Sequence, residues 1–395
     1  MISTMHRLIF ALSLVFILLA PGTAQAGTRL GIDVLADNDF SILKGKRIGL
    51  VTNQTGVDGS GTKTRVVLKK HANLVALYTP EHGLDGTEKA GVYVSSRRDP
   101  ITGVMAHSLY GPTRKPTAAM LKGIDVLVYD MQDIGCRSYT YISTMIKCME
   151  AAGEHGLEFV VLDRPNPLGG NRIEGPGMES QWISFIGQVP TPYVHGMTAG
   201  EIARMANALG WASPRCNLKV VEMRGWSRGM VWADTGLSWV RPSPNIPHAD
   251  SSAYYVATGL VGELPVNVGC GGPLPFEIFA SRGVNSERLT AHMKGLGLKG
   301  VSFSPYPVGV RIKLSNRSDT DLTALNVHLL VQAHRMGGSL FARAKSGQIN
   351  LFYKGYGSAN IRKQVESGMS AEKIIAGWQS GVSRFRSARQ PYLIY

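Results

Sequence analysis

The sequence predicts an α/β protein with a Rossmann-like, doubly wound and mostly parallel sheet, followed by a smaller α+β domain. Short apolar runs of strand length alternate with amphipathic stretches of helix length in the first half of the chain. Most of these runs are apolar throughout, as strands buried on both faces are. The rhythm changes after about residue 226, and this change predicts the second domain.

The first half is expected to form consecutive βαβ units. Its strand-like runs lie at residues 47–52, 74–78, 104–109, 125–129, 159–162 and 218–222. Its helical stretches lie at 62–71, 117–121, 141–155 and 198–209. Glu201 follows Thr198 by three residues, the spacing of a capping box, so the last of these helices is expected to start with Thr198 as its cap.

A proline-rich stretch at 241–247 cannot continue through a helix or a central strand, so it predicts a domain boundary. The expected division is a signal peptide over 1–26, a catalytic domain over 27–240 and a smaller domain over 241–395. In the smaller domain, strands are expected at 301–303 and 308–314, and helices at 324–335 and 371–385. Trp378 and Phe385 are expected in the core, and Tyr392 to Tyr395 are expected to dock against the fold.

The first 26 residues have the pattern of a secretory signal peptide. His6 and Arg7 precede an apolar run at 8–20, and an Ala-Gln-Ala end follows at 24–26. The run is shorter than the ~20 residues that span a bilayer. We expect cleavage after Ala26, a periplasmic or secreted protein, and no stable membrane insertion of the mature chain.

The composition excludes several classes of protein. Of the 395 residues, 44% are hydrophobic and 18% charged, which fits disordered, collagen-like, coiled-coil and multi-span membrane proteins poorly. The net charge of +14 attracts polyanions. An exported chain meets acidic wall polymers before nucleic acid, so no nucleic-acid partner is expected. Four cysteines allow two disulfides in three pairings, and we expect at most one bridge.

Polar side chains cluster directly after the apolar runs, at the sheet edge where open parallel sheets bind ligands. Asp130 and Asp163 could instead cap helices. The cluster consists of Asn53, Gln54, Glu81, His82, Asp130, Asp133, Arg137, Asp163, Arg164 and Asn166.

Several catalytic motifs are missing from the sequence, namely those of dinucleotide-binding, P-loop, zinc-protease and serine-hydrolase sites. A metal site could be built from His82, Glu81, Asp130, Asp133, His195 and His248, but no pair has the i, i+4 spacing of a recognisable site, so no metal and no other cofactor is expected. The carboxylates also suit a glycosidase, which needs a proton donor at the leaving oxygen and a second carboxylate.

Longer motifs are more specific. Thr-Pro-Glu-His-Gly at 79–83 and the segments 108–117, 132–145, 162–170 and 174–176 together resemble the exo-β-N-acetylmuramidase (NamZ-type) family, over about residues 31–395. The resemblance implies release of N-acetylmuramic acid from the non-reducing ends of peptidoglycan fragments, without a metal. It also implies a site in the cleft between the two domains. Peptidoglycan fragments are then the expected partner, and the oligomeric state is left open.

The family's functional residues map onto individual positions. Glu81 and Glu277 match the glutamates of its Pro-Glu-His-Gly and Pro-Phe-Glu motifs, and with His82 they are the expected catalytic residues. The loop at 263–271 departs from the family pattern, because Glu263 is displaced by one position and Cys270 replaces an arginine.

Arg137 or Arg164 is therefore expected to bind the lactyl carboxylate of the substrate. The loop at 268–273 and Glu277 are expected to face the strand ends of the first domain. The expected substrate-binding residues are Asn53, Gln54, Asp130, Asp133, Arg137, Tyr139, Tyr141, Asp163, Arg164 and Asn166.

Two other functions fit the same pattern. A periplasmic binding protein for a sugar or wall fragment would also combine two α/β lobes with a polar cleft, and it would show no turnover. A metal-assisted hydrolase on the same scaffold would be sensitive to chelators.

Overall fold

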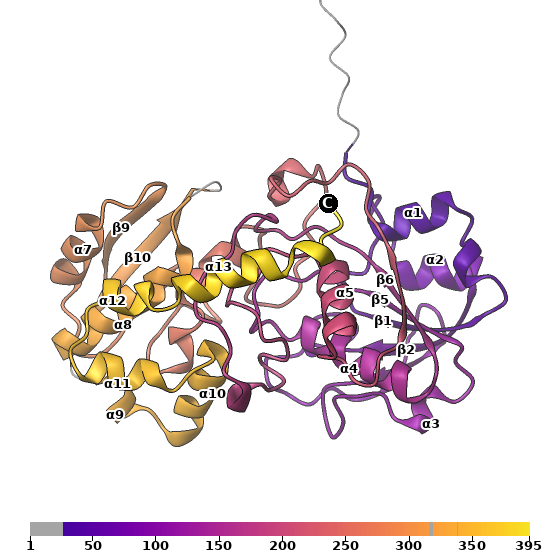
Figure 1. The fold of residues 1–395 in the computed structure, drawn as a ribbon, viewed down its shortest axis with the longest axis horizontal. Helices are drawn as coiled ribbons and strands as arrows, with labels where there is room; N and C mark the ends of the chain where they lie inside the picture. The colour runs from indigo at the N-terminus through magenta and orange to yellow at the C-terminus, as the bar shows by residue number, and fades with distance from the viewer. Residues whose placement is uncertain (1–26, 316–318, 338) are drawn as a thin grey trace, which may run out of the picture.

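The structure is a computed structural model that describes residues 27–315, 319–337 and 339–395, so the predicted signal peptide lies outside the described residues. Figure 1 shows a larger α/β half and a second half in which helices pack around a small sheet. The seven strands of the larger sheet have the order β3-β4-β2-β1-β5-β6-β7. Neighbouring strands are parallel except at the edge pair β3 and β4. The predicted doubly wound, mostly parallel sheet is confirmed.

All six strands and four helices predicted for the first half are present, with ends within two residues of the predicted ones. The strands are β1 (Arg47–Thr52), β2 (Asn73–Thr79), β3 (Arg97–Arg98), β4 (Met105–Ser108), β5 (Val126–Asp130), β6 (Glu158–Leu162) and β7 (Asn217–Val221). The helices are α1 (Gly31–Asp37), α2 (Thr64–His71), α3 (Ala118–Leu121), α4 (Tyr141–Glu154) and α5 (Ala199–Leu209). Strand β3 and helix α1 were not predicted.

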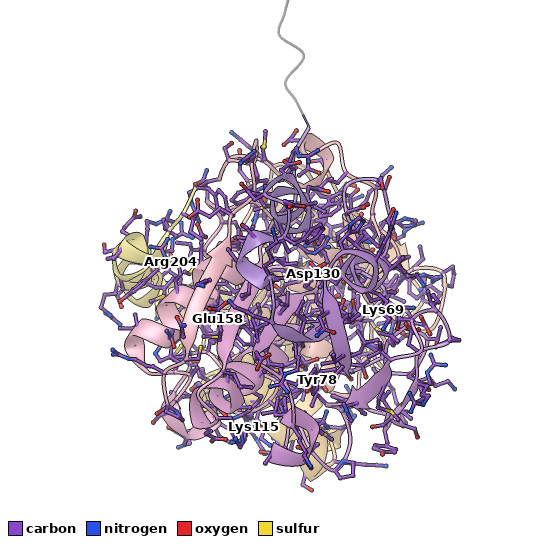
Figure 2. All side chains as sticks on the ribbon, turned by 90° about the vertical axis from the view of Figure 1, so that its right-hand side faces the viewer. Lys69, Tyr78, Lys115, Asp130, Glu158 and Arg204 are labelled. Atoms are coloured by element: carbon purple, nitrogen blue, oxygen red, sulfur yellow. The ribbon has the colours of Figure 1, made fainter. Side chains whose placement is uncertain are left out.

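Helices cover both faces of the sheet because its strands are apolar on both sides. Val126 and Val128 of β5 belong to the core under α1 and α2, whereas Leu127 and Tyr129 belong to the core under α4 and α5. In Figure 2, which looks at this half from its side, Asp130 at the end of β5 lies near the centre, and Lys69, Lys115 and Arg204 lie farther out.

Helix α5 begins as its capping box predicts. The Thr198 side chain accepts a hydrogen bond from the Glu201 amide at 3.2 Å, and the Glu201 carboxylate accepts one from the Thr198 amide at 3.1 Å. The helix ends at Gly210, whose φ of 71° is a conformation that glycine adopts without strain.

The second half contains an antiparallel sheet of three strands in the order β8-β10-β9. Its strands are β8 (Ile278–Ala280), β9 (Val301–Tyr306) and β10 (Gly309–Leu314). Its helices are α6 (Ser251–Thr258), α7 (Ser286–Gly295), α8 (Leu322–Gly337), α9 (Leu340–Arg343), α10 (Ser346–Tyr356), α11 (Asn360–Glu366), α12 (Ala371–Ala376) and α13 (Gln379–Ala388). Short 3₁₀ turns lie at Ser41–Leu43, Ser180–Trp182, Trp232–Asp234, Val261–Glu263 and Gln390–Tyr392.

The predictions for this half are confirmed in part. Both predicted strands and the helix at 324–335 are present, and Trp378 and Phe385 are buried as expected. The helix predicted at 371–385 is wrong in its continuity, because it divides into α12 and α13 at Gly377 and Trp378. Glycine is a poor residue for a helix interior, which favours a break at this position.

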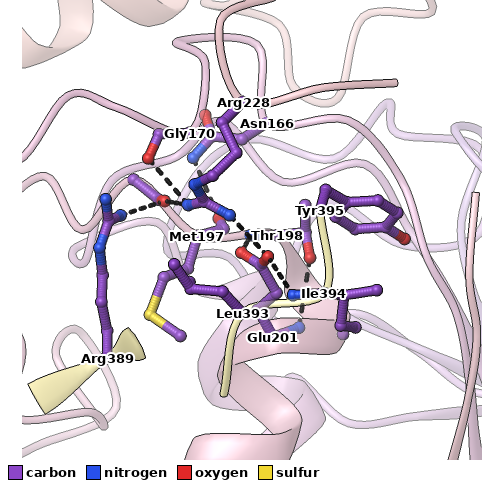
Figure 3. A network of polar contacts seen from close by, with 12 residues as sticks. Asn166, Gly170, Met197, Thr198, Glu201, Arg228, Arg389, Leu393, Ile394 and Tyr395 are labelled. Atoms are coloured by element: carbon purple, nitrogen blue, oxygen red, sulfur yellow. Dashed lines mark hydrogen bonds and ion pairs between the residues drawn. The ribbon is translucent and has the colours of Figure 1, made fainter. Parts of the chain in front are cut away.

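The two halves share one apolar core. Met145 of α4, Val256 of α6, Leu325 of α8 and Phe352 of α10 belong to the same buried cluster. A smaller contact lies where residues 394 and 395 reach helix α5. The Ile394 amide donates to the Glu201 carboxylate at 2.9 Å, and Arg228 pairs with the same carboxylate at 2.6 Å (Figure 3). The predicted docking of 392–395 is confirmed.

All four cysteines are free, and Cys270 alone among them is exposed. This agrees with the expectation of at most one bridge. Within residues 27–395, as far as they are described, no helix is both long and apolar enough to cross a bilayer.

Candidate active site

Glu81 lies in a tight turn directly after β2. The Gly83 amide donates to the Pro80 carbonyl at 3.1 Å, and His82 takes a φ of 68°, which a residue other than glycine rarely adopts. Both carboxylate oxygens of Glu81 accept a hydrogen bond at 2.8 Å, one from the Gly91 amide and one from the Thr140 hydroxyl. The turn and these two donors fix the carboxylate at the carboxyl end of the sheet.

His82 serves the neighbouring loop. Its Nδ1 lies 2.7 Å from the Glu88 carbonyl oxygen, and its side chain lines a cavity of about 320 Å³ together with Thr79 and Tyr93. No described polar contact joins its ring to Glu81. The structure therefore gives His82 a role in holding the loop that carries Gly91, and the prediction that it is catalytic receives no geometric support.

Three tyrosines surround Glu81. Burial raises the pKa of Tyr110 to about 12, and the charge of Glu81 adds to this shift. Burial also raises the pKa of Tyr139 and Tyr141, and both are affected by Glu81 as well. The Tyr141 hydroxyl donates to the Pro242 carbonyl at 2.5 Å, whereas the buried Tyr139 hydroxyl has no hydrogen-bond partner. Tyr139 is thus available to a ligand.

Glu263 is the glutamate of the second half that faces Glu81. It is an exposed residue, and its pKa is raised first by partial loss of solvation from neighbouring groups and then by the Glu81 carboxylate. Cys270 lies beside it, since burial and then Glu263 raise the pKa of that thiol to about 11. The predicted loop at 268–273 does therefore approach the strand ends.

The prediction for Glu277 receives no support from its surroundings. Its carboxylate pairs with Arg311 at 3.1 Å and raises the pKa of Tyr254, whereas Glu263 acts on the adjacent Tyr255. Neighbouring residues on helix α6 point in different directions. None of the described interactions joins Glu277 to Glu81, so Glu263 replaces it as the candidate from the second half.

Asp133 is a third acidic group of the site. Its Oδ2 accepts a hydrogen bond from the Gly135 amide at 2.7 Å, while its buried Oδ1 has no partner. Burial raises its pKa to about 7. Its charge also acts on Tyr139, which places Asp133 and Glu81 on either side of that tyrosine.

Exposure separates the residues that a ligand can touch from those beneath them. Glu81, Asp133, Tyr139, Thr140 and Tyr110 each keep 8–9% of their surface exposed. The residues beneath them, at 0–1%, are Asn53, Asp130, Arg137, Tyr141 and Asp163. The second group lies beneath the first and supports it.

Asp130 and Arg164 form a buried ion pair. The Arg164 guanidinium donates to both Asp130 oxygens, at 2.5 and 3.0 Å, and to the Val57 carbonyl at 2.5 Å. The Thr64 hydroxyl donates to the same carboxylate at 2.5 Å. Arg164 is thereby committed to internal partners, which corrects the prediction that it binds the lactyl carboxylate.

Asp163 caps helix α5, the alternative that its position also allowed. Its carboxylate accepts hydrogen bonds from the Thr198 hydroxyl at 2.7 Å, the Gly200 amide at 2.8 Å and the Tyr395 hydroxyl at 2.9 Å. Burial raises its pKa to about 6 in spite of these donors. The prediction of substrate binding is wrong for Asp163.

Arg137 joins the two halves. Its guanidinium donates to the carbonyl oxygens of Pro176, Thr191, Gly355 and Tyr356. The last two belong to the end of α10 in the second half. A substrate carboxylate could reach Arg137 only by displacing these carbonyls, so its predicted role is also corrected.

Gln54 and Asn166 shape loops of the site. The Gln54 amide donates to the carbonyls of Arg241 and Pro242 at 2.8 and 2.9 Å, which holds the proline-rich segment across the strand ends. The Asn166 amide donates to the Met197 carbonyl at 3.0 Å. Both are supporting residues, although the Gln54 Oε1 atom is buried and unpartnered.

Arg114 is a site residue that the strand-end argument missed. Its guanidinium carbon lies 3.5 Å from the ring centroid of Tyr110 and 4.8 Å from that of Phe185. Arg114 also acts on the pKa of Tyr110, the same tyrosine that Glu81 affects. Both Tyr110 and Arg114 lie within the motif at 108–117, and Thr140 lies within that at 132–145, so these motifs carried the signal.

The buried side-chain atoms without a hydrogen-bond partner are spread over the described chain, and six of them lie at this sheet edge. Besides those of Gln54, Asp133 and Tyr139, they include Asn53 Nδ2, Gln132 Oε1 and Arg114 Nη1. Buried polar atoms nearly always have a partner, so such a group indicates a place that a ligand or water completes. The proposed metal set is not supported, since no three His, Cys, Asp or Glu side chains of the described chain gather in a way that could hold an ion.

A cavity larger than the one beside His82 lies elsewhere in the described chain. It measures about 580 Å³ and is lined by Arg172, Glu174, Arg228 and residues near Asp250 and Asp321, none of them a predicted site residue. Arg172 pairs with Glu174, and Arg228 pairs with Glu201. Because none of the predicted site residues lines this cavity, we place the candidate site at Glu81.

Comparison with known proteins gives concordant matches over both halves. Residues 48–250 match the model of the N-terminal part of exo-β-N-acetylmuramidase NamZ, and residues 253–395 match that of its C-terminal part. The chain is 40% identical over 380 residues to the peptidoglycan β-N-acetylmuramidase NamZ of Bacillus subtilis strain 168, covering 92% of this chain and 91% of that protein.

Two crystal structures of DUF1343 family proteins from Bacteroides fragilis NCTC 9343 have the same fold. One has a TM-score of 0.86 at 42% identity, and the other a TM-score of 0.72 at 31% identity. In each case the match covers 93% of this chain and 99% of the other.

Proposed function

The chain belongs to the exo-β-N-acetylmuramidase NamZ family and is a peptidoglycan muramidase, and we propose that it releases N-acetylmuramic acid from the non-reducing ends of glycan fragments by carboxylate acid/base chemistry. The observation that carries this proposal is the Glu81 carboxylate. It is fixed at the end of β2 by two hydrogen bonds and faces a second carboxylate, Glu263, from the other half.

The two glutamates have environments suited to different tasks. The Glu81 carboxylate accepts two hydrogen bonds that fix its position, and a carboxylate held there can stabilise or attack the anomeric carbon or activate a water. Burial and the neighbouring Glu81 raise the pKa of Glu263, which keeps it protonated to higher pH than an ordinary glutamate. Glu263 then donates the proton to the leaving oxygen, since a carboxyl group with a raised pKa is suited to act as general acid.

The remaining polar groups support binding of one terminal sugar. The free Tyr139 hydroxyl and the free Asp133 Oδ1 lie next to Glu81 and offer hydrogen bonds to the ring substituents. The segment at 241–242, held by Gln54 and Tyr141, crosses the strand ends. This obstruction on one side supports exo action, in which the site closes against the end of a glycan.

The test is hydrolysis of 4-nitrophenyl β-N-acetylmuramide, with the matching glucosaminide as control substrate. Glu81→Gln keeps the shape of the side chain but removes the charge and the acid/base function, so kcat should fall by about 10²–10⁴. Glu263→Gln should give a loss of the same order, whereas Glu277→Gln, in the same half but paired with Arg311, should keep most of the activity.

Three results would count against the proposal. Wild-type turnover by Glu81→Gln would remove Glu81 from the reaction. Binding of muramide without any turnover would favour a binding protein, and loss of activity with a chelator would favour a metal-assisted hydrolase.

We also propose that the chain is exported and cleaved after Ala26, because of the signal-peptide pattern. The N-terminal sequence of the protein recovered from the periplasm or the medium tests this. A protein retained in the cytoplasm with residues 1–26 attached would contradict it.

A further inference from the structure

Selectivity for N-acetylmuramic acid requires a cation near the catalytic carboxylates. This sugar differs from N-acetylglucosamine by a lactyl ether on the same ring as the scissile bond, and its carboxylate is ionised at neutral pH. The two arginines expected from the sequence to bind it, Arg137 and Arg164, are committed to internal partners. Another cation must therefore supply the selectivity.

Arg114 shares a neighbour with Glu81. Tyr110 is affected both by the Glu81 carboxylate and by the Arg114 guanidinium, so its hydroxyl lies between the two groups. Arg114 follows β4, which is hydrogen-bonded to β2, the strand that ends at Glu81. The cation and the carboxylate thus project from adjacent strands at the same edge of the sheet.

The guanidinium of Arg114 is held in place by aromatic rings. Its central carbon lies 3.5 Å from the centroid of Tyr110 and 4.8 Å from that of Phe185, and these two rings are themselves 6.1 Å apart. These distances place Phe185 roughly at a right angle to Tyr110 as seen from the guanidinium carbon, so Tyr110 stacks on the cation and Phe185 lies beside it. The N–H groups that point away from Phe185 can still donate to an anion.

The hydrogen-bonding state of Arg114 points to a missing anionic partner. Its Nη1 is buried and has no hydrogen-bond partner, and no ion pair joins it to a carboxylate within the described residues. The next residue, Lys115, differs, because it pairs with Glu154 at 2.6 Å. Leaving a buried N–H group of a cation without a partner is costly, and a carboxylate that accepts from it removes that cost.

We propose that Arg114 binds the lactyl carboxylate of the terminal N-acetylmuramic acid, with Tyr110 next to both the guanidinium and Glu81, and with Phe185 packed beside the guanidinium. The proposal rests on the proposed function for the identity of the substrate. It makes Arg114 the residue that distinguishes muramic acid from glucosamine.

The test changes the arginine and the carboxylate separately and together. Wild type and Arg114→Gln are assayed on 4-nitrophenyl β-N-acetylmuramide and on its analogue with the lactyl carboxylate converted to a carboxamide. Wild-type kcat/KM should fall about 10²-fold from carboxylate to carboxamide, because a charged hydrogen-bonded partner is lost. The kcat/KM of Arg114→Gln on the carboxylate substrate should be lower than that of wild type by a similar factor. On the carboxamide, its kcat/KM should be little lower still.

Two controls exclude a purely structural effect. Lys115→Ala removes the adjacent cation and should leave the preference for the carboxylate unchanged. Arg114→Lys keeps the charge without the planar edge, so its preference for the carboxylate substrate should be intermediate. If Arg114→Gln does not fold, Arg114→Lys still tests the proposal. Thermal unfolding of each variant reports folding directly.

The outcomes separate this proposal from the function on which it rests. Equal losses by Arg114→Gln on both substrates, or no loss on either, would overturn it. If wild type hydrolyses neither substrate, the proposed function fails, and calorimetric binding of free N-acetylmuramic acid and N-acetylglucosamine still decides the role of Arg114. Weaker binding of the muramic acid alone by Arg114→Gln would support it, and unchanged binding would refute it.

Discussion

Replacing Arg137 by methionine should destabilise the fold without changing substrate preference. The guanidinium donates to four backbone carbonyls, two in the first half and two at the end of α10, and only 1% of the residue is exposed. Methionine fills much of the same volume but leaves all four carbonyls without this donor. Each buried group left unpaired costs about 1–3 kcal/mol, although carbonyls that keep a second partner or gain a water cost less.

The expected total loss is therefore about 3–5 kcal/mol, the size seen when one member of a buried charged network is removed. For a chain of this length the loss should appear as a fall in Tm of several degrees, measured by differential scanning fluorimetry. Arg137→Lys keeps one charged donor, so its Tm should lie between those of wild type and Arg137→Met. The folded fraction of Arg137→Met should retain the wild-type ratio of kcat/KM for muramide over its carboxamide analogue. A stable Arg137→Met that has lost this ratio would refute the structural role and restore the sequence-based one.

Three further outcomes are expected. Burial raises the pKa of Asp133 to about 7, above its value in an unfolded chain. The folded state therefore keeps a proton that the unfolded chain loses, and the stability of the fold decreases as pH rises from about 4 to 7. Asp133→Asn should remove this pH dependence, so the Tm of the variant minus that of wild type should increase between pH 5 and pH 8, and a constant difference would contradict the prediction. Tyr395→Phe removes a hydroxyl that donates to Asp163 and accepts from the Met223 amide, both at 2.9 Å. The free energy of unfolding measured by chemical denaturation should fall by about 1–3 kcal/mol. An unchanged denaturation midpoint would show that these two hydrogen bonds do not stabilise the fold. Thr140→Val removes one of the two donors to Glu81 and should lower kcat more than it raises KM, in contrast to Thr140→Ser, which keeps the hydroxyl.

The strands and the capped helix of the first half were predictable because their signals are local. A run that is apolar throughout, such as 126–129, has few alternatives to a buried strand, and the Thr198–Glu201 spacing specifies a helix start. Strand β8 has only three residues and owes its existence to pairing with β10, so its own sequence carries little signal. The break between α12 and α13 depends in the same way on packing that one short segment does not encode.

The site was predictable as a region but not as a set of contacts. The strand ends do carry its polar residues, yet sequence alone does not show which layer each occupies. Asp133 reaches the surface layer, whereas Asp130, three residues earlier, is paired beneath it with Arg164. Glu277 and Glu263 were separable only in three dimensions, because the difference lies in which side of α6 each glutamate faces.

The contacts of Arg137 and Tyr395 also bear on how such a protein can change during evolution. Backbone carbonyls of Gly355 and Tyr356 complete a side chain of the first half, and Tyr395 completes the cap of a helix in that half. A recombination event that exchanged the second half for an unrelated sequence would leave both groups without partners. The two halves are therefore expected to be inherited and to diverge as one unit, and neither is expected to serve as an exchangeable module in other architectures.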